Sequence, residues 1–281
     1  MGPIPTFFLK HKIYGIFIVL FILYLAITWG MHRDGYFIPT VPKQDLSPLF
    51  SKTAWDATDY ALIYEQTGLA APIVEELKKQ PHFAERLLHF QQNFLKKVTL
   101  GTRPLNLLTR EDYLPSLEGT AWPHFDIAPY QNGDIFLTKS TYTLGWRHGH
   151  GGIVVDKKRG KTLEAFSPGT ISSENDASRW HYYPTFKLLR VKGISQAEQQ
   201  LVVDYALGHL NGLPYKILAT KDQGENLAYT QCSLLIWQAF YYSLGLDLDA
   251  NKGYFVTPQN IASSPYLETL QIIGFNPQKD W

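Results

Sequence analysis

An uncharged apolar stretch from Ile13 to Met31 constrains this chain more than any other feature of its 281 residues. Lipid cannot hydrogen-bond backbone polar groups, so a single segment that crosses a bilayer has to be helical. As a helix the stretch is about 28 Å long, close to the hydrocarbon thickness of a membrane. The sequence therefore predicts one transmembrane helix at residues 13–31.

The flanking charges predict how this helix is oriented. Lys10 and Lys12 precede it, and no net charge follows directly after it. Cytoplasmic flanks carry the excess of Lys and Arg, so residues 1–12 are expected to be a cytoplasmic tail and the remainder to lie outside the cell membrane. A cleaved signal peptide and a buried helix of a hairpin are the alternatives. The apolar stretch is unusually long for a signal peptide and ends without a convincing cleavage site.

Composition excludes some functions but selects none. The chain is 45% hydrophobic, enough for a substantial core. Its 26 Lys and Arg nearly balance its 25 Asp and Glu, which leaves a net charge of +1. No electrostatic signature of a nucleic-acid partner is present. With one cysteine, the chain forms no intramolecular disulfide.

The chain beyond the anchor divides by pattern into three regions. Residues 32–50 carry prolines and polar residues without periodicity and are expected to be a linker. Residues 51–130 are expected to be a helical and irregular N-terminal region, irregular from 101 onward because prolines recur there. Residues 131–281 combine alternating, strand-like stretches with separate helices. This mixture indicates an α+β fold with an antiparallel sheet and packed helices.

The only cysteine, Cys232, begins a strongly apolar helical stretch, TQCSLLIWQAFYYSLG. Leu235, Ile236, Ala239 and Phe240 follow at helical spacing, so the cysteine lies on an apolar stripe and a core role is one interpretation. Its position at the helix start favours a second interpretation. The unpaired N–H groups and positive dipole end of the first turn stabilise a thiolate, which indicates a nucleophile.

A predicted hairpin supplies the partners that such a nucleophile needs. The segment IVVDKKRGKTLEAF has strand patterns on both sides of a turn. If Val155 pairs with Lys161, Glu164 faces Gly152, and His150 lies on the same face of the sheet one diagonal step away. A carboxylate in that place orients the imidazole and leaves its second nitrogen for a thiol.

Other interpretations of these side chains remain open. A one-residue slip in the turn would separate His150 from Glu164. His148 shares the parity of His150 and is the alternative base. A zinc site formed by these two histidines with His181 is conceivable, although no further Cys or His spacing supports a metal.

Seven short motifs carry a family resemblance. Each motif alone is weak evidence, but their order along the chain is specific. They are Gly133-Asp134-Ile135, His150 in GHGGIVV, Leu163-Glu164-Ala165, Leu189-Arg190-Val191, Gly212-Leu213-Pro214-Tyr215, Tyr229-Thr230-Gln231-Cys232-Ser233 and Thr257-Pro258-Gln259. This set resembles the YiiX/YebB-like branch of the NlpC/P60 superfamily, the circularly permuted papain-like cysteine hydrolases. The resemblance covers about half of the chain. Leu234 stands where the family often has a glutamate, and Gln231 where it often has an aromatic residue.

The resemblance implies a permuted papain-like hydrolase domain at residues 131–281. In it Cys232 is the nucleophile, His150 the general base and Glu164 the residue that orients the histidine. Acyl transfer by such a set needs no metal and no organic cofactor. The implied substrates are amides of cell-wall peptides. A lipid amide or ester is the second possibility, and a non-catalytic module that binds wall or lipid ligands is the third.

Overall fold

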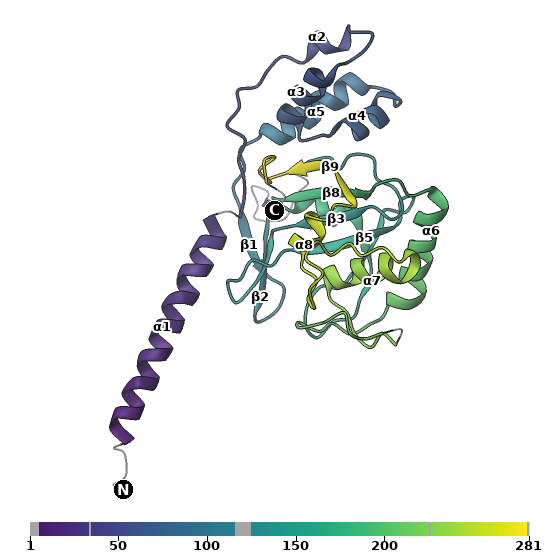
Figure 1. The fold of residues 1–281 in the computed structure, drawn as a ribbon. Coiled ribbons are helices and arrows are strands. Elements are labelled where there is room, and N and C mark those ends of the chain that lie inside the picture. The colour runs from purple at the N-terminus through teal and green to yellow at the C-terminus, as the bar shows by residue number, and fades with distance from the viewer. Residues whose placement is uncertain (1–5, 34, 116–124, 225, 280) are drawn as a thin grey trace.

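A six-stranded antiparallel sheet lies at the centre of the structure, a computed structural model that describes residues 6–33, 35–115, 125–224, 226–279 and 281 (Figure 1). Its strand order is β7-β6-β5-β3-β8-β9. The strands are β3 (Ile135–Thr138), β5 (His150–Asp156), β6 (Lys161–Glu164), β7 (Ser173–Asp176), β8 (Phe186–Val191) and β9 (Leu267–Ile273). With the helices around this sheet the chain is α+β, as the sequence predicts.

Two helical segments cover one face of the sheet. They are α6 (Gln196–Tyr205), which continues as a π-helical turn over Ala206–Leu210, and α7 (Cys232–Leu244). Alternate strand residues such as Ile153 and Leu189 pack there against Val202 and Leu235 in one apolar cluster. This alternation is the period of two that the strand patterns require. Helix α8 (Pro258–Ala262) adds Ile261 to the same cluster.

The helical region near the N-terminus shares a core with the sheet. It contains α2 (Ser47–Phe50), α3 (Ala57–Thr67), α4 (Ala71–Lys78) and α5 (Phe83–Leu95), which lie beyond the β9 edge (Figure 1). The Ala70 N–H donates to Leu270 O at 2.9 Å, and Ile272 N–H donates to Gly68 O at 2.9 Å. Ile73 and Phe90 of these helices join Phe136 and Leu188 of the sheet in a second apolar cluster.

Local signals explain where these helices begin and end. The Asp56 carboxylate accepts hydrogen bonds from the N–H groups of Thr58 and Asp59, and so caps α3 at its start. Gly68 ends the same helix with a φ of 70°, a conformation that suits glycine. The expected linker at residues 32–50 includes α2 and buries Leu46 completely.

The expectation of an irregular stretch from 101 to 130 is wrong at two places. Strands β1 (Gly101–Pro104) and β2 (Thr109–Tyr113) form a hairpin, and β2 pairs further with β4 (Thr141–Thr143). Their polar sequences carry no hydrophobic alternation, the pattern by which strands are recognised. Polar side chains are tolerated there because the buried Glu111 carboxylate has guanidinium partners.

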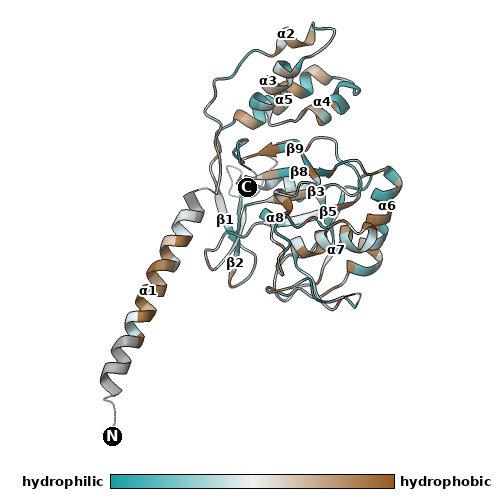
Figure 2. Cartoon of the chain, viewed as in Figure 1, coloured by the Kyte–Doolittle hydropathy of each residue, from teal (hydrophilic) through white to brown (hydrophobic). Residues whose placement is uncertain are grey.

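Helix α1 (Thr6–Arg33) contains the predicted transmembrane segment. Its Ile13–Gly30 stretch is long and apolar enough to cross a membrane, and none of that stretch is buried against the rest of the protein. Figure 2 shows the apolar character along its described length. These properties suit a membrane anchor or a signal sequence. Of the expected cytoplasmic tail, residues 1–5 lie outside the described residues, and residues 6–12 belong to α1.

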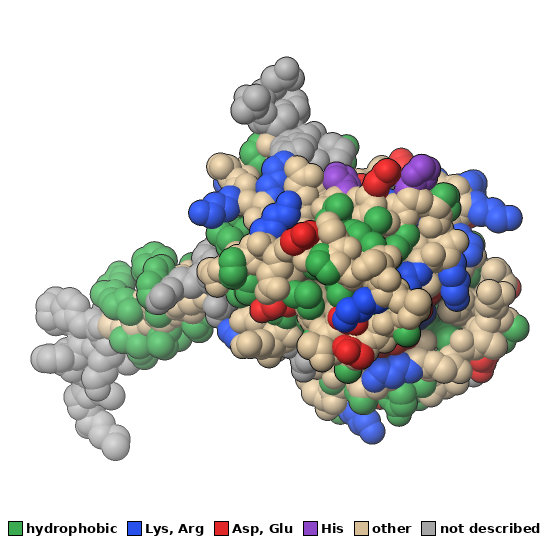
Figure 3. Space-filling view, turned by 90° about the horizontal axis from the view of Figure 1, so that it is seen from above, with side chains coloured by type: hydrophobic (Ala, Val, Ile, Leu, Met, Phe, Trp, Pro, Cys, Tyr) green, Lys and Arg blue, Asp and Glu red, His purple; other side chains and the backbone are tan. Residues whose placement is uncertain are grey.

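The opposite end of the molecule has a mixed surface. Figure 3, which views the molecule from the side of α2–α5, shows charged side chains of both signs and histidines among apolar ones. Such a mixture is ordinary for a solvated protein surface.

Candidate active site

Helix α7 places Cys232 at its first position, as the sequence predicts. Gln231 is the residue that caps this helix, and its side-chain oxygen accepts from the Ser233 N–H at 3.1 Å. The same oxygen accepts from the Cys232 thiol at 3.2 Å. The amide nitrogen of Gln231 donates to Val256 O at 2.7 Å, which fixes the cap. Cys232 is 4% exposed.

The β5–β6 hairpin brings His150 and Glu164 together. Gly152 pairs with Glu164, as the sequence predicts. The turn differs, because Asp156 rather than Val155 pairs with Lys161, and a β-bulge at Val155 takes up the extra residue. The bulge lies between the turn and the functional end of the hairpin, so the predicted face is kept. His150 Nε2 lies 2.7 Å from Glu164 Oε2.

Two glycines of the GHGG motif allow this close packing. A Cβ at Gly151 would lie 2.8 Å from Ile236 Cδ1 of α7 and 2.8 Å from Leu137 Cδ2 of β3. A Cβ at Gly152 would lie 2.7 Å from Glu164 Cγ. The first glycine therefore lets α7 approach β5, and the second leaves room for the carboxylate.

His150 interacts with both predicted partners. Its burial lowers the imidazole pKa, but hydrogen bonds to Cys232 and Glu164 outweigh that effect and raise the pKa to about 9. Burial in turn raises the pKa of Glu164, and the hydrogen bond from His150 more than compensates, so that pKa lies below its ordinary value. The protonated imidazole and the ionised carboxylate thus stabilise each other. The structure brings all three predicted site residues together.

Three further residues hold this set, and no sequence motif assigns a role to any of them. Trp180 Nε1 donates to Glu164 Oε1 at 3.0 Å, and its ring stacks on His150 with centroids 5.6 Å apart. Thr162 Oγ1 also donates to Glu164 Oε1. Phe166 stacks on His150 with centroids 4.7 Å apart. Thr162 lies two positions before Glu164, and residues two apart on a strand share a face, so the sequence could have predicted this contact. Trp180 lies in a 3-10 helix without periodicity, so no sequence pattern indicates its contact.

The other two histidines have partners of their own. His148 lies 2.8 Å from Thr143 Oγ1 through Nε2 and 2.6 Å from Gly149 O through Nδ1. His181 Nδ1 lies 2.6 Å from Phe125 O. Within the described part of the chain, no group of three or more His, Cys, Asp or Glu side chains is arranged to hold a metal ion.

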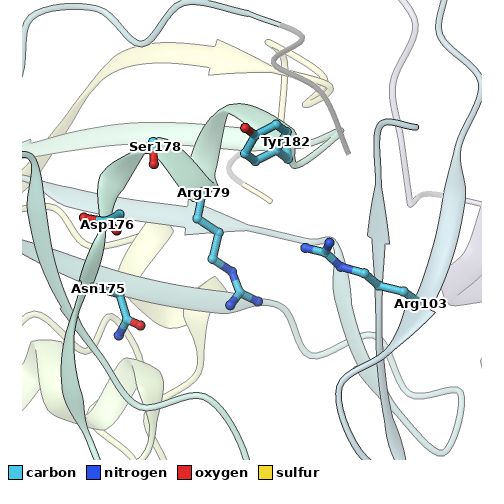
Figure 4. Close-up of a pocket in the computed structure, with 6 residues that line it drawn as sticks. All are labelled: Arg103, Asn175, Asp176, Ser178, Arg179 and Tyr182. Carbon is cyan, nitrogen blue, oxygen red and sulfur yellow. The ribbon is translucent and has the colours of Figure 1, made fainter. Parts of the chain in front are cut away.

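A pocket of about 440 Å³ carries two guanidinium groups. It is lined by Arg103, Asn175, Asp176, Ser178, Arg179 and Tyr182, and Figure 4 shows Arg103 and Arg179 extending toward each other. Arg179 also packs 4.1 Å above the ring of Phe166, which stacks on His150.

Each guanidinium keeps donors available for a ligand. Both arginines donate to the buried carboxylate of Glu111, Arg103 through Nε at 2.7 Å and Arg179 through Nη2 at 2.8 Å. Arg179 Nε donates to Tyr183 Oη at 3.2 Å. Among the described residues, Nη1 of Arg179 and both terminal nitrogens of Arg103 have no hydrogen-bond partner. The pocket is therefore suited to an anionic group.

Comparisons with known proteins find one curated relative and one solved structure. The chain is 24% identical over 206 residues to the uncharacterized protein YycO of Bacillus subtilis (strain 168), which covers 70% of this chain and 78% of that protein. It also resembles the crystal structure of metalloprotein YiiX from Escherichia coli O157:H7, with a TM-score of 0.42 and 19% identity over 52% of this chain and 98% of that one. No family model matches the chain. Membership of the YiiX/YebB-like branch and of the NlpC/P60 superfamily stays a prediction.

Proposed function

We propose that this chain is a membrane-anchored cysteine hydrolase that cleaves an amide bond in cell-wall peptides. One observation carries the proposal: the only cysteine of the chain begins a helix and interacts with a buried histidine that is hydrogen-bonded to a buried glutamate. That arrangement of nucleophile, base and orienting carboxylate is the one acyl transfer requires. In this proposal residues 131–281 form a permuted papain-like domain of NlpC/P60 type outside the cell membrane, and α1 is its anchor.

The chemistry then follows from the positions of the groups. His150 holds the proton of the Cys232 thiol, and the thiolate sulfur attacks the carbonyl carbon of the substrate. The backbone N–H of Cys232, at the start of α7, donates to the oxyanion that forms. His150 passes its proton to the leaving amine as the C–N bond breaks. Water, deprotonated by His150, then hydrolyses the thioester and restores the thiol.

The arginine pocket supports a peptide substrate. Cell-wall peptides carry free carboxylates, and a guanidinium group binds a carboxylate through paired hydrogen bonds. In this proposal Arg103 and Arg179 bind an acidic group of the substrate beside the scissile amide. Arg179 packs on Phe166, the ring that stacks on His150, so an acidic group bound there would lie one side chain away from the histidine.

A lipid amide or ester is the second candidate substrate, and a specific observation favours it. The segment that holds the Gln231 cap exposes large apolar side chains, Tyr254 at 74% and Phe255 at 49%. Leu218 is 64% exposed on the loop that follows Tyr215, whose phenol interacts electrostatically with Cys232. Apolar side chains in such a position would contact an acyl chain.

Hydrolysis assays separate these candidates. The full-length protein in nanodiscs is incubated with muropeptides and, separately, with acylated lipids, and the products are identified by mass spectrometry. We expect release from muropeptides, and we expect Cys232→Ala to abolish it because no other thiol exists in the chain. Release from lipids alone selects the second candidate. Release that persists in Cys232→Ala, or no release from either substrate, contradicts the hydrolase proposal.

A further inference from the structure

Two neighbouring turns expose apolar side chains that no core accounts for. One turn, residues 105–108, joins β1 to β2, and the other, residues 144–146, follows β4. The Leu144 N–H donates to Leu108 O at 3.0 Å, which holds the turns together. Their exposed apolar side chains are Leu107 at 97%, Leu144 at 58%, Trp146 at 51% and Leu108 at 45%. We call these four residues the apolar tip.

The apolar tip lies against the membrane-spanning stretch of α1. Gly145, at its centre, has a φ of 83°, and a Cβ there would lie 2.9 Å from Thr28 Cγ2 and 3.1 Å from Tyr24 Oη. Tyr24 and Thr28 belong to the last turns of the Ile13–Gly30 stretch. Figure 1 shows α1 running past the same end of the molecule to which the β1–β2 turn points. The tip is thus level with a part of the helix that lipid would surround.

The chemistry of the tip matches the edge of a bilayer. Leucine side chains gain free energy on leaving water, and tryptophan is enriched where the hydrocarbon meets the headgroups. Arg110, on β2 directly beyond the tip, is exposed, and a cation there attracts anionic headgroups. The remainder of the β1–β2–β4 sheet is mostly polar, so the apolar side chains are confined to the end that lies beside α1.

We propose that the apolar tip enters the membrane interface beside α1 and holds the domain in a fixed orientation on the lipid surface. The partner is the bilayer itself. This inference rests on the proposed anchor role of α1, and it is independent of the hydrolase activity. A domain held only by α1 could rotate about the helix, and contact of the apolar tip with the bilayer would restrict that rotation.

Site-directed fluorescence tests the inference. In full-length Cys232→Ser, single cysteines are introduced by Leu107→Cys, Trp146→Cys or Leu201→Cys and labelled with a fluorophore that is sensitive to polarity. Leu201, 54% exposed on α6, is the matched control at a site away from α1. Each protein is reconstituted into phosphatidylethanolamine and phosphatidylglycerol vesicles that contain a doxyl-labelled lipid. All three variants replace exposed side chains, so the core is not disturbed.

At positions 107 and 146 we expect the emission maximum of the probe to shift to shorter wavelength and the doxyl-labelled lipid to quench its fluorescence. We expect neither effect at position 201. Retention of the protein through alkaline carbonate extraction is measured on the same vesicles. Retained protein whose probes at 107 and 146 behave like the probe at 201 overturns the docking surface and leaves the anchor intact. Release by carbonate overturns the anchor and the docking surface together, and it leaves the proposed cysteine chemistry in place, because neither extraction nor fluorescence measures hydrolysis.

Discussion

At the scale of single residues, the protonated state of His150 is the property on which the proposed chemistry depends. Its imidazole is buried, which alone would favour the neutral form. The hydrogen bonds to Glu164 and Cys232 reverse that preference and raise its pKa to about 9. Glu164 remains ionised because His150, Thr162 and Trp180 donate to it. The proton therefore stays on the imidazole through neutral pH, ready for the leaving amine.

Replacing the carboxylate should move the pH profile of the reaction. In Glu164→Gln the protonated imidazole loses an opposite charge, so its pKa falls from about 9 by roughly one to three units. On the alkaline side of the pH profile, kcat/KM should then begin to fall at a correspondingly lower pH. Glu174→Gln, on the neighbouring strand β7, is the control and should leave the alkaline limb in place. An alkaline limb unchanged in Glu164→Gln would show that this carboxylate does not act on His150.

The three residues of the candidate site could be predicted from the sequence more readily than the side chains that support them. Cys232, His150 and Glu164 follow from a helix start, a strand start and the parity of a hairpin. Trp180 and the arginine pair of the pocket do not, because they come from segments that are brought together only by the folded chain. A buried carboxylate such as Glu111 gives no signal in sequence until its guanidinium partners are placed beside it.

At the scale of elements, the approach of α7 to β5 decides whether the cysteine reaches the histidine. Gly151→Ala should force the two apart, since the new Cβ would lie 2.8 Å from the buried side chains of Ile236 and Leu137. We expect a loss of about 1–3 kcal/mol in the free energy of unfolding, measured with urea. A reduced kcat/KM should accompany it. Because Ile236→Val removes the contacting Cδ1 atom, the double variant should recover part of both losses. A single variant that matches the wild type in both would contradict the close approach.

Elements with strong local signals were predicted, and elements that depend on long-range contacts were missed. Helix α3 has its cap at Asp56 and its terminal glycine, and α7 begins and ends at the predicted residues. Strands β1, β2 and β7 are short and polar. Helix α6 continues beyond Tyr205 as a π-helical turn, and the hydrophobic period alone does not distinguish an α-helix from a π-helix.

At the scale of the whole molecule, one ionic network joins the sheet to the N-terminal helices. Arg190 of β8 donates through Nε and Nη2 to the Asp134 carboxylate, each at 2.8 Å, and it also contacts Glu76 of α4. Asp134 is completely buried, and burial raises its pKa despite the opposing effect of Arg190. The network thus connects two of the motifs found in the sequence, Gly133-Asp134-Ile135 and Leu189-Arg190-Val191.

Breaking this network should destabilise the whole fold. Arg190→Met leaves Asp134 buried without its cation, and we expect a loss of about 3–5 kcal/mol in the free energy of unfolding. Glu76→Gln should cost much less, because Glu76 is partly exposed and its partner Arg190 keeps Asp134. Urea unfolding followed by circular dichroism measures both. Equal losses of stability in the two variants would contradict the claim that the buried Arg190–Asp134 pair contributes most of the stability of this network.

The presence of one cysteine makes the central claim directly measurable. Every thiol adduct formed on this protein reports on Cys232, so the rate of alkylation by iodoacetamide at neutral pH can be followed by intact mass. If His150 activates the thiol, His150→Ala slows alkylation by about tenfold or more. His148→Ala, whose ring contacts Thr143 and Gly149 instead, should leave the rate near that of the wild type. Equal rates in the wild type and His150→Ala would contradict the account of Cys232 as a nucleophile activated by His150.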